Sequence, residues 1–388
     1  MARLKQDLKA ICEYQIHLFN TPAPFERYVF MTTVLDNGFG GLEHKASTAL
    51  MCSRNDLPKN EHGEVDKGYR TYLSLCSHEY FHSWNVKRIK PAQFTPFDLS
   101  KESYTEQLWA YEGITSYFDD LITYRSGCID QDIYLTLLSE TMTRVYRSQG
   151  RFKQSLASSS FNAWTKFYKQ DENAANAIVS YYTKGALFAL LLDLTIRLET
   201  EGQKSLDDVM RTLWQEYGLT GIGTDNQSHQ RIVESLLNRN CDELFSFLYH
   251  TNDLPLAPLL AKVGVEMQFR SSEGANDNGG GKAKGFNIGF GAKVKSEGIG
   301  LKVLSVNQHS PAHQAGLSAG DLLIAADNLQ VNGQFEQLLQ HYTVGETIKL
   351  HWFRRDELMQ GELIIQAAIK DTVTLKLKDK QLARIWLG

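Results

Sequence analysis

The sequence predicts an α+β protein with a short β region, a long helical region and a small β-rich module near its C-terminal end. Residues 28–35 (YVFMTTVL) and 46–51 are rich in β-branched and aromatic residues, which favours strands. From about residue 69 to residue 249, apolar residues recur at helical spacing. Residues 271–285 (SSEGANDNGGGKAKG) contain five glycines and almost no apolar side chain, which is typical of a linker.

A chain of 388 residues is long enough for two or three domains, and the linker is the clearest boundary between them. We expect a first domain over residues 1–270, with its β region at about 25–60 and its helical region at about 66–270. The expected segments that follow are a glycine-rich linker at 271–285, a β-rich module at 286–370 and a C-terminal tail at 371–388.

The composition argues against several classes of protein. With 42% hydrophobic residues, 22% charged residues and a net charge of -4, the chain is typical of a globular protein and lacks the basic excess of a nucleic-acid binder. Residues 1–20 mix charged and apolar residues at helical spacing, which predicts an amphipathic helix and not a signal peptide. No stretch approaches the ~18 consecutive apolar residues of a membrane span. We therefore expect a cytoplasmic protein.

A metal-binding motif begins at His78. His78, Glu79 and His82 form an HExxH pattern in a stretch without proline or glycine. On a helix, residues four apart share a face, so both imidazoles can approach one ion. Glu79 lies beside them and can take a proton from a bound water. The pattern predicts a zinc peptidase site with Glu79 as the general base.

A third ligand is expected from a second helix. Catalytic zinc sites use three protein ligands and leave a fourth position open, and Glu112 in the segment WAYEG is the candidate. Asp119 lies seven residues further on, on the same helical face, where it can orient a histidine ligand. A solvated acidic face is the alternative interpretation of Asp119. We expect one Zn²⁺ per chain, bound by His78, His82 and Glu112.

These segments also carry a family resemblance. HEYFHSWNVKRIKP, followed by WAYEGITSYFDD, resembles the glycyl aminopeptidase family of zinc metallopeptidases, which are distant relatives of the aminopeptidase N family. The resemblance implies a thermolysin-like catalytic domain and covers the chain from about residue 28 to its end. Members of that family carry a further β-rich domain ahead of the catalytic one, so the resemblance implies that this sequence is either a fragment or a shortened homologue.

The resemblance assigns a role to the segment GGLEH. It is similar to the GxMEN motif of aminopeptidase N relatives, whose glutamate binds the free α-amine of the substrate. Glu43 and Gly41 are therefore the expected substrate-binding residues. His44 departs from the motif, which usually has asparagine there. A carboxylate that pairs with the amine would fix how much peptide lies between it and the metal.

The resemblance also implies an oxyanion donor. The segment YTKG is similar to the YxKG segment of the same relatives, in which the tyrosine hydroxyl donates to the oxyanion. Tyr182 is the expected residue, and the adjacent Tyr181 is the alternative register. Lys87 and Arg88, in the segment NVKRI, receive no role, because cations near a helix C-terminus are common for reasons of the helix dipole alone.

The C-terminal module resembles a PDZ domain of the bacterial protease type, through GFNIG and then SPAHQAGLSAGDLL. Such a domain pairs an extended peptide with a strand edge and binds the peptide's C-terminal carboxylate with loop amides. The resemblance implies that the loop is formed by Gly285, Phe286, Asn287, Ile288 and Gly289.

These inferences predict a zinc-dependent aminopeptidase that removes small N-terminal residues, glycine or alanine, from peptides. A zinc endopeptidase is the first alternative, because it shares the HExxH chemistry but needs no amine-binding glutamate. A weakly active protein that binds peptides through its PDZ domain is the second alternative. Whether Glu43 binds the substrate's amine distinguishes the aminopeptidase from the endopeptidase.

Overall fold

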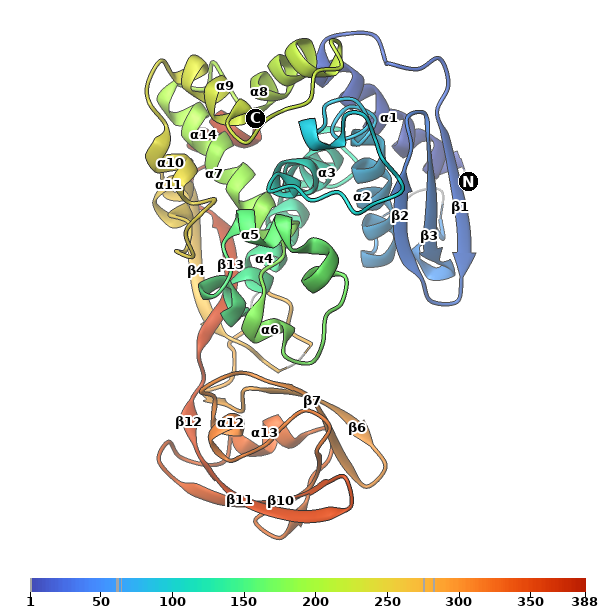
Figure 1. The fold of residues 1–388 in the computed structure, drawn as a ribbon. Helices are drawn as coiled ribbons and strands as arrows, with labels where there is room; N and C mark the ends of the chain where they lie inside the picture. Colours follow the sequence, from blue (N-terminus) through green and yellow to red (C-terminus); the bar gives the residue numbers. More distant parts are fainter. Residues whose placement is uncertain (1, 61–62, 64, 275, 282) are drawn as a thin grey trace.

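The computed structural model describes residues 2–60, 63, 65–274, 276–281 and 283–388. A large helical domain carries a small sheet on one side, and a β-rich module lies apart from it at the other end (Figure 1). This agrees with the α+β class expected from the sequence. Within the described part of the chain, no helix is long and apolar enough to cross a membrane.

The first elements form the expected amphipathic helix and β region. Three strands make a sheet in the order β1-β3-β2, in which β1 and β3 are parallel and β2 is antiparallel to β3. Strand β2 is therefore an edge strand, and helix α2 packs against β2 and β3. The elements are α1 (Ala2–Phe19), β1 (Val29–Leu35), β2 (Phe39–Glu43), β3 (Ser47–Ser53) and α2 (Lys67–Phe81).

The helical region follows and holds most of the core. Helix α7 is buried on every side along residues 184–196, which makes it the centre of the domain. The α-helices are α3 (Ile114–Arg125), α4 (Gln131–Arg147), α5 (Leu156–Phe161), α6 (Ala174–Ala177), α7 (Thr183–Glu199), α8 (Leu206–Leu213), α9 (Ser228–Leu237), α10 (Asp242–Ser246) and α11 (Leu256–Lys262). Short 3₁₀ or π turns lie at Arg54–Asp56, Ala92–Phe94, Trp109–Gly113, Gln149–Phe152, Ala163–Phe167 and Trp214–Gly218.

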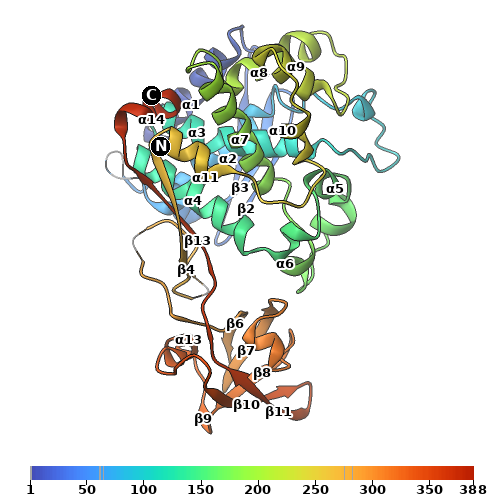
Figure 2. The same cartoon turned by 90° about the vertical axis from the view of Figure 1, so that its left-hand side faces the viewer.

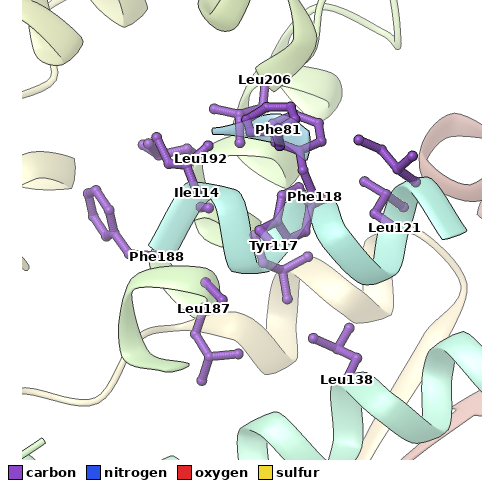
Figure 3. Packing of buried hydrophobic residues seen from close by; sticks show 14 of the residues in the cluster. Phe81, Ile114, Tyr117, Phe118, Leu121, Leu138, Leu187, Phe188, Leu192 and Leu206 are labelled. Carbon is purple, nitrogen blue, oxygen red and sulfur yellow. The ribbon is translucent and has the colours of Figure 1, made fainter. Parts of the chain in front are cut away.

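Packing between α2 and α3 fixes the geometry of the predicted site. Phe81, at the end of α2, stacks on Phe118 of α3 with ring centroids 5.0 Å apart. Phe118 also lies near Ile114, with Leu206 of α8 beside Phe81 (Figure 3). All four side chains are fully buried. Because these contacts hold the two helices together, ligands on α2 and on the turn before α3 keep their relative positions.

The C-terminal module has its own sheet and its own apolar core. Its main strands run in the order β11-β10-β8-β7-β6, so β6 is an edge strand, and β9 pairs with β8. The elements are β5 (Ile288–Gly289), β6 (Ala292–Glu297), β7 (Gly300–Val306), α12 (Pro311–Gln314), β8 (Leu322–Ala326), β9 (Leu329–Gln330), α13 (Phe335–Leu339), β10 (Thr347–Arg354), β11 (Glu357–Ile364) and β12 (Gln366–Ala367).

The C-terminal segment differs from the tail expected at residues 371–388. Strand β13 (Lys370–Leu377) pairs with β4 (Val265–Ser271), and helix α14 (Lys380–Leu387) packs into the core of the helical domain. Trp386 is fully buried and its Nε1–H donates to the hydroxyl of Tyr117 at 3.0 Å. The module is thus inserted between two strands of the helical domain (Figure 2). Burial of this apolar surface gives the segment its order.

The glycine-rich stretch is also more tightly held than a flexible linker. Arg270 pairs with Asp277, with Nη2 and Oδ1 2.9 Å apart, and the main chain at Gly279 lies against Thr143 of α4. Partial burial acts to raise the pKa of Asp277, but hydrogen bonds from Arg270 and two backbone amides hold it at about 2. Gly279 has a φ of +102°, and a Cβ there would overlap Thr143, so glycine is required for the contact.

Candidate active site and metal centre

Three side chains that suit a metal ion lie together at the junction of α2 and α3. Ligand atoms of His78, His82 and Glu112 all lie within 4.8 Å of one another. The Glu112 Oε2 atom is 3.2 Å from Nε2 of His78 and 3.3 Å from Nε2 of His82. Two imidazole nitrogens and one carboxylate oxygen are a typical donor set for catalytic zinc, so the residues fit such an ion.

Local helix geometry produces this arrangement. His78 lies in the last turn of α2 and His82 is its C-cap, so both rings project from one face. Glu112 lies in the π turn Trp109–Gly113 that leads into α3. Widened turns of this kind are frequent at functional sites, because they change the direction of one side chain within a helix.

Each histidine has its Nε2 atom near Glu112 and its Nδ1 atom within hydrogen-bond distance of a second oxygen. The Nδ1 of His78 lies 3.0 Å from Oδ2 of Asp119, and the Nδ1 of His82 lies 2.7 Å from the backbone carbonyl oxygen of Asn85. If each Nδ1 carries the proton, both Nε2 atoms are free to bind a metal. Asp119 thus lies within hydrogen-bond distance of His78, as the expected orienting role requires. Asn85 was not foreseen, because a backbone carbonyl leaves no pattern in the sequence.

The histidines and carboxylates of the site change one another's pKa values. Burial acts to lower the pKa of His78, but hydrogen bonds with Asp119 and Glu112 outweigh burial and raise it well above its ordinary value. Burial likewise acts to raise the pKa of Glu112, but the two imidazoles hold it well below its ordinary range. In the metal-free protein these groups thus attract protons to the histidines.

Glu79 lies next to the three residues and is largely buried. Its Oε2 is 3.5 Å from the hydroxyl of Thr48, and burial raises the pKa of its carboxyl group. The backbone of Gly41 passes so close that a Cβ at this position would overlap Oε1 of Glu79. Gly41 therefore lets strand β2 approach the carboxylate, which explains a glycine at this position.

Glu43 lies at the end of β2 and lines the same cavity as Glu79. Its Oε1 is 3.4 Å from Nζ of Lys87, a residue just beyond α2 to which the sequence assigned no role. The neighbouring Arg88 instead donates to the backbone carbonyls of Ser83, Lys45 and Pro24, which is a structural role. His44 does not line the cavity; its Nδ1 lies 3.2 Å from the Leu42 carbonyl oxygen.

Two adjacent tyrosines occupy different environments. Tyr182 lines the cavity, and its ring centroid is 6.2 Å from that of His78. Tyr181 is 1% exposed and points into the core. The hydroxyl of Tyr168, which sequence reasoning missed, lies 3.3 Å from both of the other hydroxyls. Burial and the carboxylate of Glu112 raise the pKa of Tyr182, so its hydroxyl stays protonated and can donate.

One cavity of about 990 Å³ is lined by the three candidate metal ligands together with Glu43, Glu79, Asp119, Tyr168 and Tyr182. Its walls come from the edge strand β2, from helices α2, α3 and α4, and from the segment between residues 167 and 186. A cavity of this size can hold several residues of an extended peptide.

The loop expected to bind a peptide C-terminus lies in the module and not at this cavity. The N–H of Phe286 donates to Ser272, and the N–H groups of Asn287 and Ile288 both donate to Oε1 of Gln340, at 2.9 and 3.0 Å. Gln340 follows α13 and was not foreseen from the sequence. A carboxylate would have to displace it to reach these two amides.

Comparisons with known proteins agree with both parts of the chain. Residues 71–188 match the family model of the M61 glycyl aminopeptidase, and residues 286–365 match that of the PDZ domain. The solved structure of an aminopeptidase N family protein from Idiomarina loihiensis is similar, with 48% identity and a TM-score of 0.96. The match covers 100% of this chain and 66% of that one, so this chain spans less than two thirds of its length.

Other solved structures match this chain over a smaller share and at lower identity. The HtrA-type protease AlgW with decapeptide is 18% identical, and the match covers 21% of this chain and 30% of that one with a TM-score of 0.20. The serine endoprotease from Yersinia pestis is 21% identical over the same shares, also with a TM-score of 0.20. A search of curated proteins finds no match. The chain thus contains a segment of the M61 glycyl aminopeptidase family at residues 71–188 and a PDZ domain at residues 286–365, which is inserted between β4 and β13.

Proposed function

We propose that the chain is a zinc-dependent aminopeptidase that hydrolyses the first peptide bond of peptides with glycine or alanine at the amino terminus. The observation that carries the proposal is the convergence of His78, His82 and Glu112 beside Glu79, in a cavity that Glu43 also lines. The family description, glycyl aminopeptidase, supports the choice of small N-terminal residues.

The chemistry divides among these residues. A bound zinc ion supplies a Lewis acid that polarises the scissile carbonyl and lowers the pKa of water toward ~7. Glu79 accepts the proton of the attacking water and later gives it to the leaving amine, a task suited to a carboxylate whose pKa burial has raised. Asp119 holds the ring of His78 in place throughout.

Glu43 supports the choice of an aminopeptidase. Its partner Lys87 is a primary ammonium group, which is the chemistry of a peptide's amino terminus. A substrate amine can take the place of that ammonium and keep the carboxylate paired. The amine would then be held at a fixed distance from the metal, and the first peptide bond would lie over it.

Removal of the metal tests this function. We expect hydrolysis of glycyl and alanyl p-nitroanilides to stop after treatment with a chelator and to return when about one equivalent of Zn²⁺ is added. The absorbance of p-nitroaniline is the measurement, and elemental analysis gives the metal content of the same samples. Hydrolysis that continues at an unchanged rate in metal-free protein would contradict the proposal.

Tyr182 is expected to donate to the oxyanion that forms during hydrolysis. Tyr182→Phe should lower kcat by about 10²- to 10³-fold, because it removes one donor and leaves the ring in place. Tyr181→Phe is the matched control, since its hydroxyl contacts Tyr168 and does not line the cavity. Steady-state kinetics on an alanyl peptide would measure both. If Tyr181→Phe is the impaired variant, the oxyanion donor is assigned to the wrong residue.

A further inference from the structure

The active-site cavity continues along α2, well beyond the candidate metal centre. Lys67, Arg70 and Ser74 of α2 line this part of the cavity together with Arg144 of α4. Lys67 and Arg70 begin a stripe that ends at His78, since residues three, four and seven apart share one face of a helix. The same open space therefore joins these cations to the reacting groups.

The two arginines have few partners within the protein. Neither forms an ion pair or a side-chain hydrogen bond with another residue in the described part of the chain, and the Nε of Arg70 is buried without an acceptor. Asp120 of α3 interacts with both guanidinium groups from a distance and hydrogen-bonds Ser74. Two guanidinium groups that face one cavity, with unused donors, are suited to bind a carboxylate.

The charges at the two ends of the cavity are opposite. Around the candidate metal centre the cavity carries the carboxylates of Glu43, Glu79, Glu112 and Asp119. At the other end Lys67, Arg70 and Arg144 outnumber the carboxylates of Asp120 and Glu140. A peptide with free termini has the complementary order of charges, with an ammonium at one end and a carboxylate at the other.

The two ends of the cavity are also spaced to suit the two ends of a short peptide. Glu43 pairs with Lys87, which lies beyond the C-terminal end of α2, so the proposed amine site is at that end. Arg70 lies eight residues before His78, which is about 12 Å along the helix axis. An extended peptide advances about 3.3–3.6 Å per residue, so this length corresponds to three or four residues beyond the scissile bond.

We propose that Arg70 and Arg144 form a subsite that binds a carboxylate of the substrate three or four residues beyond the cleaved bond. The subsite rests on the proposed aminopeptidase function and narrows its substrates to peptides that carry an acidic group there. That group is either the C-terminal carboxylate of a short peptide or an acidic side chain of a longer one.

Three substrates distinguish these sources when assayed on the zinc-loaded full-length protein. They are tetra-alanine with a free C-terminus, its C-terminal amide, and a tetra-alanine amide whose last residue is replaced by glutamate. Alanyl p-nitroanilide, which has no carboxylate, reports the amine site and the chemistry alone. The variants are Arg70→Gln and Arg144→Gln. The control is Arg355→Gln, an exposed arginine outside the cavity that changes net charge equally.

We expect amidation to lower kcat/KM of the wild-type protein by about 10- to 100-fold, the range for losing charged hydrogen bonds. Arg70→Gln and Arg144→Gln should each cleave tetra-alanine and its amide with similar kcat/KM. Both variants should hydrolyse the anilide at the wild-type rate and keep the wild-type midpoint of thermal unfolding. Recovery with the glutamyl amide shows that acidic side chains are also bound, and no recovery shows selection of the C-terminal carboxylate.

Equal cleavage of the acid and the amide by an enzyme that hydrolyses the anilide would overturn the subsite alone. Failure to hydrolyse the anilide would overturn the proposed function, and the subsite with it. If Arg70→Gln does not fold, Arg144→Gln decides the outcome, because the Arg144 side chain is exposed on α4.

Discussion

Glu79→Gln is expected to reduce turnover by about 10³-fold or more while the protein keeps its metal and its fold. The amide has nearly the shape of the carboxylate, so it fits beside Gly41 and Thr48 without a new clash. It cannot accept the proton of the attacking water, and this loss affects the reaction step and not the metal ligands.

Two measurements on one sample test this expectation. Elemental analysis should give the same zinc content for variant and wild type, and the rate of alanyl p-nitroanilide hydrolysis should differ by the factor above. Glu140→Gln is a matched control, since Glu140 also lines the cavity but lies on α4, away from the metal ligands. A Glu79→Gln variant with more than a tenth of wild-type activity would rule out Glu79 as the general base.

The His78→Ala, His82→Ala double variant should lose both bound zinc and all metal-dependent hydrolysis. The two imidazoles supply two of the three protein ligands, and Glu112 alone cannot hold the ion at a useful affinity. Elemental analysis after dialysis is the measurement. Zinc content that stays near one per chain would contradict the assigned ligands.

Acidification should release the same metal from the wild-type protein. A histidine binds zinc only as the neutral imidazole. In the metal-free protein, burial acts to lower the pKa of His78, but Asp119 and Glu112 outweigh it and raise that pKa. Glu112 likewise outweighs burial and raises the pKa of His82. Protons therefore compete at a higher pH than they would for an ordinary histidine. Bound zinc should fall as pH decreases and should recover on neutralisation. Asp119→Asn should move the pH at which zinc is released to a lower value, because it removes a charge that favours the protonated form of His78.

The residues of the candidate metal centre could be singled out from the sequence because they lie on local helical repeats. The spacing of His78 and His82 requires only that the segment be helical, and Glu112 lies in the segment WAYEG just before the next helix. The position of Asp119, two turns after Glu112, follows from the same periodicity. The repeats place the side chains of each element on one face, and the packing of α2 against α3 brings the two sets together.

Other parts of the site depend on contacts between distant segments. Lys87 meets Glu43 across 44 positions, and Tyr168 meets Tyr182 through a turn that has no regular pattern. The backbone carbonyl of Asn85 orients His82, yet any residue type has a carbonyl. No periodicity marks these contacts, so only the folded chain reveals them.

The C-terminal boundary was misplaced for a similar reason. The sequence predicts a tail at residues 371–388, whereas residues 370–377 form strand β13, whose partner β4 lies about 100 positions earlier. The pairing encloses the module between two strands of the helical domain, an arrangement that the order of elements along the chain does not show. Composition predicts a flexible linker for the glycine-rich stretch, whereas the Arg270–Asp277 pair and the close approach of Gly279 to α4 hold it in place.

The comparison of one glycyl or alanyl peptide with its N-acetylated form tests the central claim most directly. Acetylation removes the charge of the amine that Glu43 would bind and leaves every scissile bond unchanged. We expect the free peptide to be shortened from its amino end and the acetylated peptide to resist. Glu43→Ala should lower kcat/KM on the free peptide by about 30-fold or more, with zinc retained. The control variant His44→Ala should behave as wild type. Internal cleavage of the acetylated peptide at a comparable rate would contradict the account and identify an endopeptidase instead.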